Sequence, residues 1–293
     1  MKAQKVVRAI PLFLTCAVLF LGACHRAPKT QSGLPQLPAG VRMQDVTFHS
    51  KALDRQISYR VFLPQNSNPN QKFPVVYLLH GAFGNSKDWS NNSDVGQYAR
   101  QGIILVMPDG GSSYYINAVG EAKDKYEDYI TQDLIADVQA RFPARNNRES
   151  RAIVGFSMGG FAAIKFALSH PDLFVVAGAL SPAIDVPSRR FSLKHADQWW
   201  RFLRIFGPLG SKEHQARDPL VLVESADPRV TPSIYLTAGE QEPLLDPSRR
   251  FGARLKQRNF DYEFHTEPGG HDWTQWNEQL PGCFAKVFEF LPR

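Results

Sequence analysis

The stretch Arg151-Ala-Ile-Val-Gly-Phe-Ser-Met-Gly-Gly-Phe161 decides the fold. Residues 152–156 form a continuous apolar run typical of a buried strand, and residues 158–170 have a helical pattern. Ser157 therefore lies on a turn that joins a strand directly to a helix. Glycines two residues to either side of the serine let the neighbouring elements approach without a Cβ clash. We expect Ser157 at the carboxyl edge of a parallel sheet, where open α/β sheets bind ligands.

The rest of the chain extends this strand–helix unit. Strand-like segments are 46–48, 57–63, 75–79, 103–107, 152–156, 174–180, 233–237 and 262–265; helical patterns are 126–142, 158–170, 247–258 and 273–291. The first two strands alternate as a half-exposed pair does, whereas the next three are continuous apolar runs. This order predicts an α/β fold with a mostly parallel, eight-stranded sheet flanked by helices.

Residues 185–227, here named the insertion, separate two predicted strands without a comparable strand candidate. The segment is long for a loop, so we predict a cap over the face that carries Ser157. Trp199, Phe202 and Phe206 have the i, i+3, i+7 spacing of one helix face, which favours packing of these rings. An apolar lid that walls an acyl or aromatic pocket is the alternative.

Ser157 is the candidate nucleophile, because the strand–Gly-x-Ser-x-Gly–helix order holds a serine on a strained, accessible turn. An idle serine on a small-residue turn is the alternative. A hydroxyl needs a base within hydrogen-bond reach to attack at neutral pH. Among the eight histidines, His271 has the best context, on the turn Pro268-Gly-Gly-His-Asp-Trp273 after the last predicted strand.

An acidic side chain should orient this histidine and stabilise its protonated form. It should follow the strand 233–237, where three acids compete: Glu240, Glu242 and Asp246. The pattern alone does not choose among them, because each of the three also fits a solvated loop charge.

Two backbone N–H groups are candidates for an oxyanion hole, the pair of donors that stabilises a negatively charged reaction intermediate. One belongs to Met158, directly after the serine, and the other to Ala82 or to Phe83 in the 80–84 turn, His80-Gly-Ala-Phe-Gly84. Each donor is worth roughly 3–4 kcal/mol of transition-state stabilisation. We expect His80 itself to pack at the end of its strand rather than to react.

The N-terminus precedes the predicted domain. Residues 1–23 carry a basic start and a short apolar run, which predicts a signal peptide. Leu21-Gly-Ala-Cys24 resembles a bacterial lipobox, which implies lipidation of Cys24 and anchoring to a membrane of the cell envelope, at the outer membrane or the periplasmic face. Residues 24–43 then form the lipidated N-terminus and a flexible tether, and 44–293 the domain. A plain secretory signal, giving a secreted protein, is the alternative.

Composition excludes several other classes of protein. Loss of the predicted signal would leave 31 basic against 28 acidic residues, too small and scattered an excess for nucleic-acid binding. Cys283 would then be the single unmodified cysteine, which leaves no intramolecular disulfide. Neither His-Glu-x-x-His nor Gly-x-Gly-x-x-Gly occurs, so we expect no metal and no organic cofactor.

Five segments in order resemble the esterase-D-like branch of the α/β-hydrolases, which includes S-formylglutathione hydrolases, feruloyl esterases and antigen-85-type mycolyltransferases. They are Leu78–Gly84 with Trp89, Met107–Gly111 with Tyr114-Tyr115, Tyr126–Ile135, Arg151–Phe161, and Pro268–Trp273 with Trp276. The resemblance spans about residues 44–291. It implies the α/β-hydrolase fold and two-step acyl transfer from an ester through Ser157.

The resemblance also bears on the acid and the substrate. It favours Glu242, at the position where much of the family has an Asp and the mycolyltransferases have a Glu. The substrate class would be a small-molecule or glycan ester, with Phe83, Tyr114, Tyr115 and Trp273 as candidates to contact it. Two alternatives stay open: acyl transfer to a carbohydrate or lipid alcohol, and a non-catalytic surface lipoprotein on the same scaffold.

Overall fold

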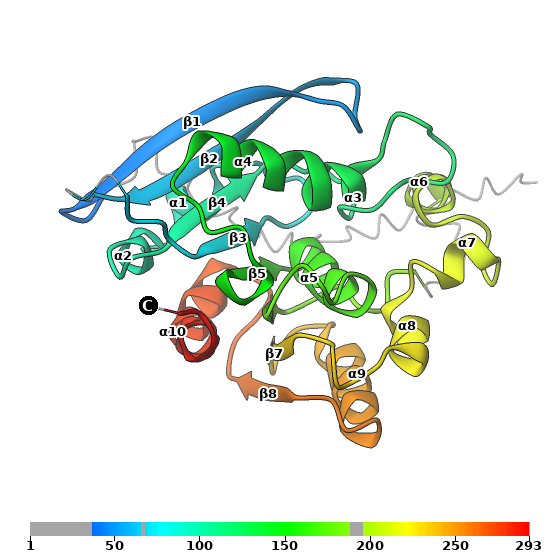
Figure 1. The fold of residues 1–293 in the computed structure, drawn as a ribbon. Helices are drawn as coiled ribbons and strands as arrows, with labels where there is room; N and C mark the ends of the chain where they lie inside the picture. Colours follow the sequence, from blue (N-terminus) through cyan, green and yellow to red (C-terminus); the bar gives the residue numbers. More distant parts are fainter. Residues whose placement is uncertain (1–36, 66–67, 69, 188–195, 293) are drawn as a thin grey trace, which may run out of the picture. The chain divides into compact units, whose positions relative to one another are not determined.

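A computed structural model describes residues 37–65, 68, 70–187 and 196–292 (Figure 1). The predicted signal peptide 1–23, Cys24 and the tether up to residue 36 lie outside the described residues. The described chain enters the sheet earlier than expected, because the first strand begins at Val41 rather than after residue 43. Val41 is buried and pairs with Pro64, so residues 41–43 belong to the domain and not to the tether.

The regular elements follow the predicted order. The strands are β1 (Val41–Ser50), β2 (Arg55–Pro64), β3 (Val75–Leu79), β4 (Ile104–Pro108), β5 (Arg151–Phe156), β6 (Val176–Leu180), β7 (Ser233–Gly239) and β8 (Tyr262–Glu267). The helices are α1 (Asp88–Asn92), α2 (Gly96–Ala99), α3 (Tyr126–Asp128), α4 (Ile135–Arg141), α5 (Met158–Ser169), α6 (Ala196–Phe206), α7 (Lys212–Gln215), α8 (Pro219–Ser225), α9 (Leu245–Gln257) and α10 (Trp273–Phe290). A π-helical segment, Tyr129–Leu134, joins α3 to α4.

The eight strands form one sheet in the order β1-β2-β4-β3-β5-β6-β7-β8. β1 and β2 pair antiparallel, β2 also pairs antiparallel with β4, and the pairs from β4 through β8 are all parallel. The prediction of a mostly parallel, eight-stranded sheet is confirmed. The parallel direction brings the carboxyl ends of β3, β5, β7 and β8 to one edge of the sheet, which is where the candidate site residues follow.

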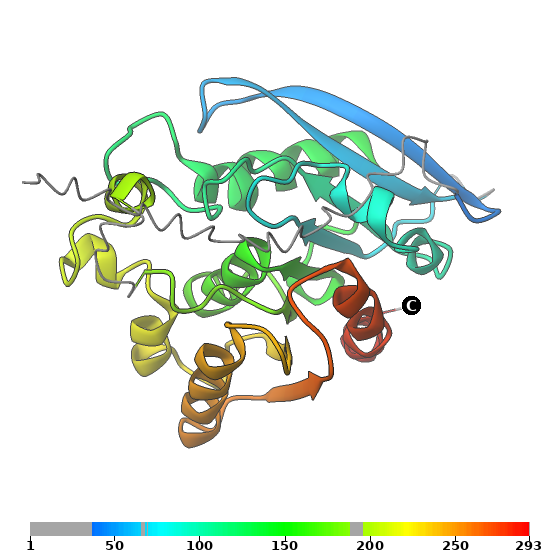
Figure 2. The same cartoon turned by 180° about the vertical axis from the view of Figure 1, so that it is seen from behind.

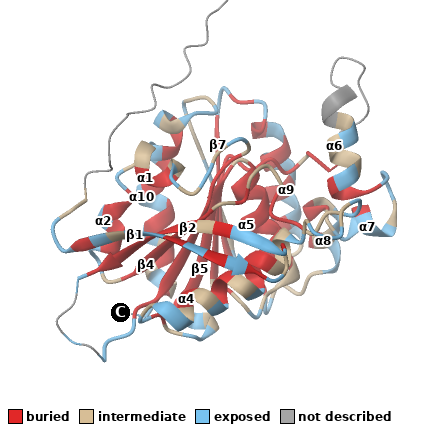
Figure 3. Ribbon diagram, turned by 90° about the horizontal axis from the view of Figure 1, so that it is seen from above, coloured by how far each residue is buried: buried red, intermediate tan, exposed pale blue. Residues whose placement is uncertain are grey.

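The central strands are buried on both faces, and Figure 3 shows them in the colour of buried residues. Successive residues of β3 alternate between two core clusters: Tyr77 belongs to the cluster that includes residues of α4, α5 and α9, and Leu78 belongs to the one that includes residues of α1, α2 and α10. Tyr98 of α2 stacks on Phe284 of α10 with ring centroids 3.7 Å apart, and both views show these helices side by side (Figures 1 and 2). Burial on both faces explains why the central strands are continuous apolar runs.

The insertion contains α6, α7 and α8, and none of its described residues forms a strand. Phe202 and Phe206 of α6 pack against Tyr114, with ring centroids 6.1 and 5.2 Å from its ring. The helical spacing therefore correctly indicated packing for these two rings. Trp200, on the same helix, is 68% exposed.

A buried ion cluster joins α3 to α5. The carboxylate of Glu127 accepts hydrogen bonds from the ammonium of Lys165 and, at 2.6 Å, from Nε2 of His170. Burial by itself raises the pKa of Glu127, but the hydrogen bond with His170 and the charge of Lys165 outweigh burial and lower it to about 2. Burial lowers the pKa of Lys165, whose side chain is nearly inaccessible. The carboxylate is therefore needed to hold this ammonium charged inside the protein.

Replacing Glu127 with Gln should destabilise the fold at neutral pH and reduce its sensitivity to acid. The folded pKa of Glu127 lies below its ordinary value of 4.5, so its contribution to the free energy of unfolding is present above that pH and lost as the pH falls toward 2. The contribution is about 3 kcal/mol. Urea unfolding of both proteins should give a difference in free energy that is largest near neutral pH and shrinks toward pH 3. A difference that stays constant across this range would contradict the prediction.

Candidate active site

The turn after β5 holds Ser157 in a strained conformation, with φ 54° and ψ −115°. A positive φ costs a non-glycine residue roughly 1–3 kcal/mol, and such strain persists only where the surroundings fix it. Here the serine N–H donates to the carbonyl of Leu180, and its own carbonyl accepts from the N–H of Phe161, each at 2.9 Å. These bonds tie the turn to the end of β6 and to the first turn of α5.

The two glycines that flank the serine are required by close contacts. A Cβ added to Gly155 would lie 2.2 Å from the carbonyl carbon of Gly159, and one added to Gly159 would lie 2.2 Å from the carbonyl oxygen of Leu79. Both contacts involve backbone atoms, which cannot move aside as a flexible side chain can. The Gly-x-Ser-x-Gly pattern is therefore explained by packing of α5 against β5 and β3.

Ser157, His271 and Glu242 form one continuous hydrogen-bond chain. Nε2 of His271 lies 2.9 Å from the Ser157 hydroxyl oxygen, and Nδ1 lies 2.6 Å from Oε2 of Glu242. The other oxygen of Glu242 accepts the N–H of Gly239 at 2.8 Å. The three residues come from turns after β5, β8 and β7, so the sheet order brings together groups that are far apart in sequence.

The environments of the three groups differ in a chemically useful way. The side chain of Glu242 is fully buried, whereas that of His271 is 31% exposed. A buried carboxylate acts strongly on the imidazole, because little water screens its charge. It fixes the proton on Nδ1 and leaves Nε2 free to accept the serine proton. The Trp276 ring packs edge-on against the imidazole with centroids 5.1 Å apart and limits its rotation.

The other two candidate acids do not reach His271. Glu240 and Asp246 are both exposed. The Asp246 carboxylate instead lies 3.7 Å from the guanidinium of Arg249 on the same helix. Burial and geometry thus distinguish Glu242 from its neighbours, which the sequence pattern left open.

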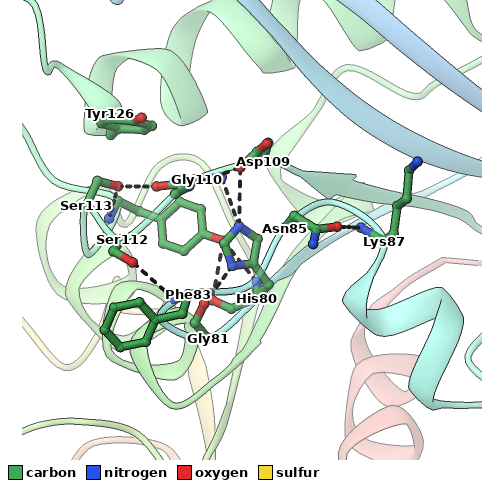
Figure 4. Close-up of polar contacts among 12 residues, drawn as sticks. His80, Gly81, Phe83, Asn85, Lys87, Asp109, Gly110, Ser112, Ser113 and Tyr126 are labelled. Carbon is green, nitrogen blue, oxygen red and sulfur yellow. Dashed lines mark hydrogen bonds and ion pairs between the residues drawn. The ribbon is translucent and has the colours of Figure 1, made fainter. Parts of the chain in front are cut away.

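The two predicted oxyanion donors are available. Among the described residues, neither the Ala82 N–H nor the Met158 N–H has a hydrogen-bond acceptor. The N–H of Phe83, the alternative donor, is committed to the hydroxyl oxygen of Ser112 at 3.0 Å (Figure 4). The 80–84 turn therefore offers Ala82 rather than Phe83.

The four candidate substrate contacts have different surroundings. Phe83 is 86% exposed, beside the free Ala82 N–H. Trp273 is half-buried and packs edge-on against Phe156, with centroids 4.7 Å apart. Tyr114 is buried by aromatic rings, and its N–H donates to the sulfur of Met158 at 3.3 Å. The prediction is wrong for Tyr115, which is fully buried. Its hydroxyl accepts a hydrogen bond from the backbone N–H of His80 at 2.9 Å.

A cavity of about 250 Å³ was not predicted from the sequence. It lies between the segment 112–126 and helix α6, and its lining includes Ser112, Tyr126, Arg201 and Arg204. Arg201 donates to the Ser112 carbonyl at 2.7 Å, and its guanidinium lies 5.4 Å from the centre of the Phe83 ring. No sequence motif marks Ser112 or Arg201, because the contact depends on where the insertion folds. In the part of the chain that the structure describes, no three His, Cys, Asp or Glu side chains converge on a metal position.

The Esterase family matches residues 50–287. The chain belongs to this family. It is a carboxylic ester hydrolase with the α/β-hydrolase fold.

Three relatives illustrate the range of the family. An acetyl esterase of Caldicellulosiruptor saccharolyticus is 28% identical over 270 residues, which cover 86% of this chain and 98% of the relative. A diacylglycerol acyltransferase/mycolyltransferase, Ag85A of Mycobacterium leprae, is 27% identical, with 99% and 94% covered. The structure of FphF, a fluorophosphonate-binding serine hydrolase of Staphylococcus aureus, superimposes with a TM-score of 0.74 at 24% identity, over 84% of this chain and 98% of that one.

Replacing Glu242 with Gln should lower kcat/KM for an activated ester by roughly 10⁴-fold, because a neutral amide neither fixes the His271 proton nor stabilises the imidazolium. Glu240→Gln and Asp246→Asn are matched controls, since both acids lie within four residues of Glu242 and are exposed. They should stay within about twofold of wild type. Initial rates of p-nitrophenyl acetate hydrolysis measure all three. A larger loss in either control would reassign the acid.

Proposed function

We propose that the chain is a serine carboxylesterase in which Ser157 is the nucleophile, His271 the general base and Glu242 the acid that orients it. The observation that carries this assignment is the unbroken contact from the serine hydroxyl through the imidazole to a buried carboxylate. The N–H of Met158 directly follows the serine, and the N–H of Ala82 lies on the turn after β3, the strand next to β5. Neither has an acceptor among the described residues, so both can donate to a developing negative charge.

Acylation begins when the Ser157 oxygen attacks the ester carbonyl carbon and its proton passes to Nε2 of His271. The carbonyl oxygen becomes an oxyanion held by the N–H groups of Ala82 and Met158. His271 is then an imidazolium, which the carboxylate of Glu242 stabilises. Collapse of the intermediate breaks the bond to the alcohol oxygen, and His271 gives its proton to the departing alkoxide.

Deacylation repeats these steps with water. His271 takes a proton from a water molecule as its oxygen attacks the acyl-enzyme carbonyl, and the same two N–H groups hold the second oxyanion. The bond to Ser157 breaks, the serine regains its proton from His271, and the carboxylic acid leaves. About a third of the His271 side chain is exposed, so the deacylating water has access to the imidazole.

We further propose a small-molecule or glycan ester as substrate. The exposed Phe83 ring beside the Ala82 N–H offers an apolar surface next to the reacting carbonyl. The acetyl esterase activity of the relative from Caldicellulosiruptor saccharolyticus supports a small acyl group.

Replacing Ser157 with Ala should abolish hydrolysis of p-nitrophenyl acetate and butyrate by the full chain, a loss of up to about a millionfold. The wild type should also be labelled covalently by a fluorophosphonate probe, and the variant should not, because the probe reacts with an activated serine. Intact-protein mass spectrometry measures the labelling. An inactive, unlabelled but folded wild type, or equal rates in both proteins, would overturn the assignment.

We also propose that residues 1–23 are a signal peptide and that Cys24 is lipidated, which anchors the protein in the cell envelope. The short apolar run that ends in Leu21-Gly-Ala-Cys24 and the Pro- and Gly-rich segment after it support this proposal. In the described part of the chain, no helix is long and apolar enough to cross a bilayer.

Replacing Cys24 with Ser should remove the lipid and release the protein from the membrane fraction. Metabolic labelling with an alkyne fatty acid, followed by fractionation, measures both effects in bacterial cells. Cys283→Ser is the matched control, because Cys283 is fully buried in the domain, and it should keep the label. A wild type that carries no label would overturn lipidation and favour a secreted protein.

A further inference from the structure

His80 lies directly after β3 and is almost completely buried, with 1% of its surface exposed. Its Nδ1 lies 2.7 Å from the carbonyl oxygen of Gly81, and the backbone N–H of Gly110 points at its Nε2 from 2.9 Å. Figure 4 shows the ring between these two turns. The hydroxyl of Tyr115 accepts a hydrogen bond from the backbone N–H of His80. The Tyr115 ring packs edge-on against the imidazole, with ring centroids 5.5 Å apart. The ring is therefore fixed from several sides.

The hydrogen-bond pattern identifies the tautomer of His80. A backbone N–H can only donate, so Nε2 must present its lone pair to Gly110. The ring is then neutral with its proton on Nδ1, and Nδ1–H donates to the Gly81 carbonyl. The nearest carboxylate oxygen, on Asp109, is 3.7 Å from Nε2, beyond hydrogen-bond distance, and this oxygen accepts the N–H of Gly111 instead.

The bond from His80 acts on the peptide that carries the Ala82 N–H. The carbonyl of Gly81 and the N–H of Ala82 belong to one planar, trans peptide unit, in which they point in opposite directions. Holding the carbonyl against the imidazole therefore directs the N–H away from it. The next peptide is held too, because the Phe83 N–H donates to Ser112. Phe83 has a φ of 64°, a strained value that such bonds must maintain.

We propose that His80 is a positioning residue for the ester hydrolysis reaction: its Nδ1–H fixes the Gly81–Ala82 peptide and so aims the Ala82 N–H at the oxyanion. This inference rests on the proposed function, in which Ala82 is one of the two oxyanion donors. His80 touches neither substrate nor Ser157 in this role. Gly110 and Tyr115 serve to hold its tautomer and its orientation.

Two substitutions separate aiming from mere packing. In His80→Asn, the side-chain amide N–H lies as far from the backbone as Nδ1 does and can donate to the Gly81 carbonyl. In His80→Gln, the amide lies one bond further out, as far as Nε2, and offers no donor to Gly81. Both remove the aromatic ring, so both should lower the melting temperature similarly. We expect H80Q to lower kcat for p-nitrophenyl acetate roughly 10²-fold with KM nearly unchanged, because an oxyanion donor acts in the transition state. H80N should stay within about tenfold of wild type.

Two further measurements read the same bond directly. A trifluoromethyl ketone reacts with the Ser157 hydroxyl to give a tetrahedral adduct that bears an oxyanion. Its affinity for H80Q should therefore fall in parallel with kcat/KM. Two-dimensional ¹⁵N–¹H spectra of the wild-type histidine side chains should show His80 with its proton on Nδ1. H80Q supplies the assignment, because its spectrum lacks that signal.

The outcomes distinguish this inference from the proposed function. A wild type that neither hydrolyses esters nor takes the fluorophosphonate label overturns both. An active wild type with unchanged kcat in H80Q, with equal losses in H80N and H80Q, or with the His80 proton on Nε2 overturns the inference alone. A selective kcat loss in H80Q together with weaker ketone binding supports it.

Discussion

The turn at Ser157 is the constraint on which the rest of the site depends. Its positive φ is maintained only because β5, β6 and α5 are packed around it, and backbone contacts at Gly155 and Gly159 leave no room for a side chain. That packing sets the height of the serine above the sheet. The strands β3, β7 and β8 run parallel to β5, so the turns that follow them begin at the same edge of the sheet as the Ser157 turn. A base, an acid and an N–H donor therefore come within reach of the serine without contributions from distant loops.

Two buried carboxylates follow the same physical rule with different consequences. Glu127 is enclosed with Lys165 and His170, so its charge is used to stabilise other charges inside the fold. Glu242 is buried more deeply than Glu127, but its partner His271 is partly exposed and contacts a hydroxyl that can react. In both cases the cost of burying an acid is offset by hydrogen bonds. What distinguishes a structural acid from the proposed catalytic one is whether the chain of contacts ends in the core or at an accessible atom.

The fold was largely predictable, because a strand buried on both faces must be a continuous apolar run, and residues 75–79, 103–107 and 152–156 are such runs. The helical spacing of Phe202 and Phe206 likewise predicted their packing. The choice among Glu240, Glu242 and Asp246 was not predictable from the pattern, since all three acids follow β7 within a few residues and the burial that distinguishes them does not show in the sequence. Tyr115 was misassigned for a related reason: the sequence does not show that its side chain is fully buried and that its hydroxyl contacts His80.

The 80–84 turn shows how much structure a single free N–H requires. The Ala82 N–H has no acceptor among the described residues, and an unpaired backbone donor is costly if it is not satisfied by water or a ligand. Its own peptide is held by the bond between the Gly81 carbonyl and His80, and the next peptide is held by the bond from the Phe83 N–H to Ser112. Ser112 is in turn contacted by Arg201 of α6 through its carbonyl. Ser112 thus links Arg201 of the insertion to the turn that carries the proposed oxyanion donor. Changes in α6 can therefore alter this turn without contacting Ser157.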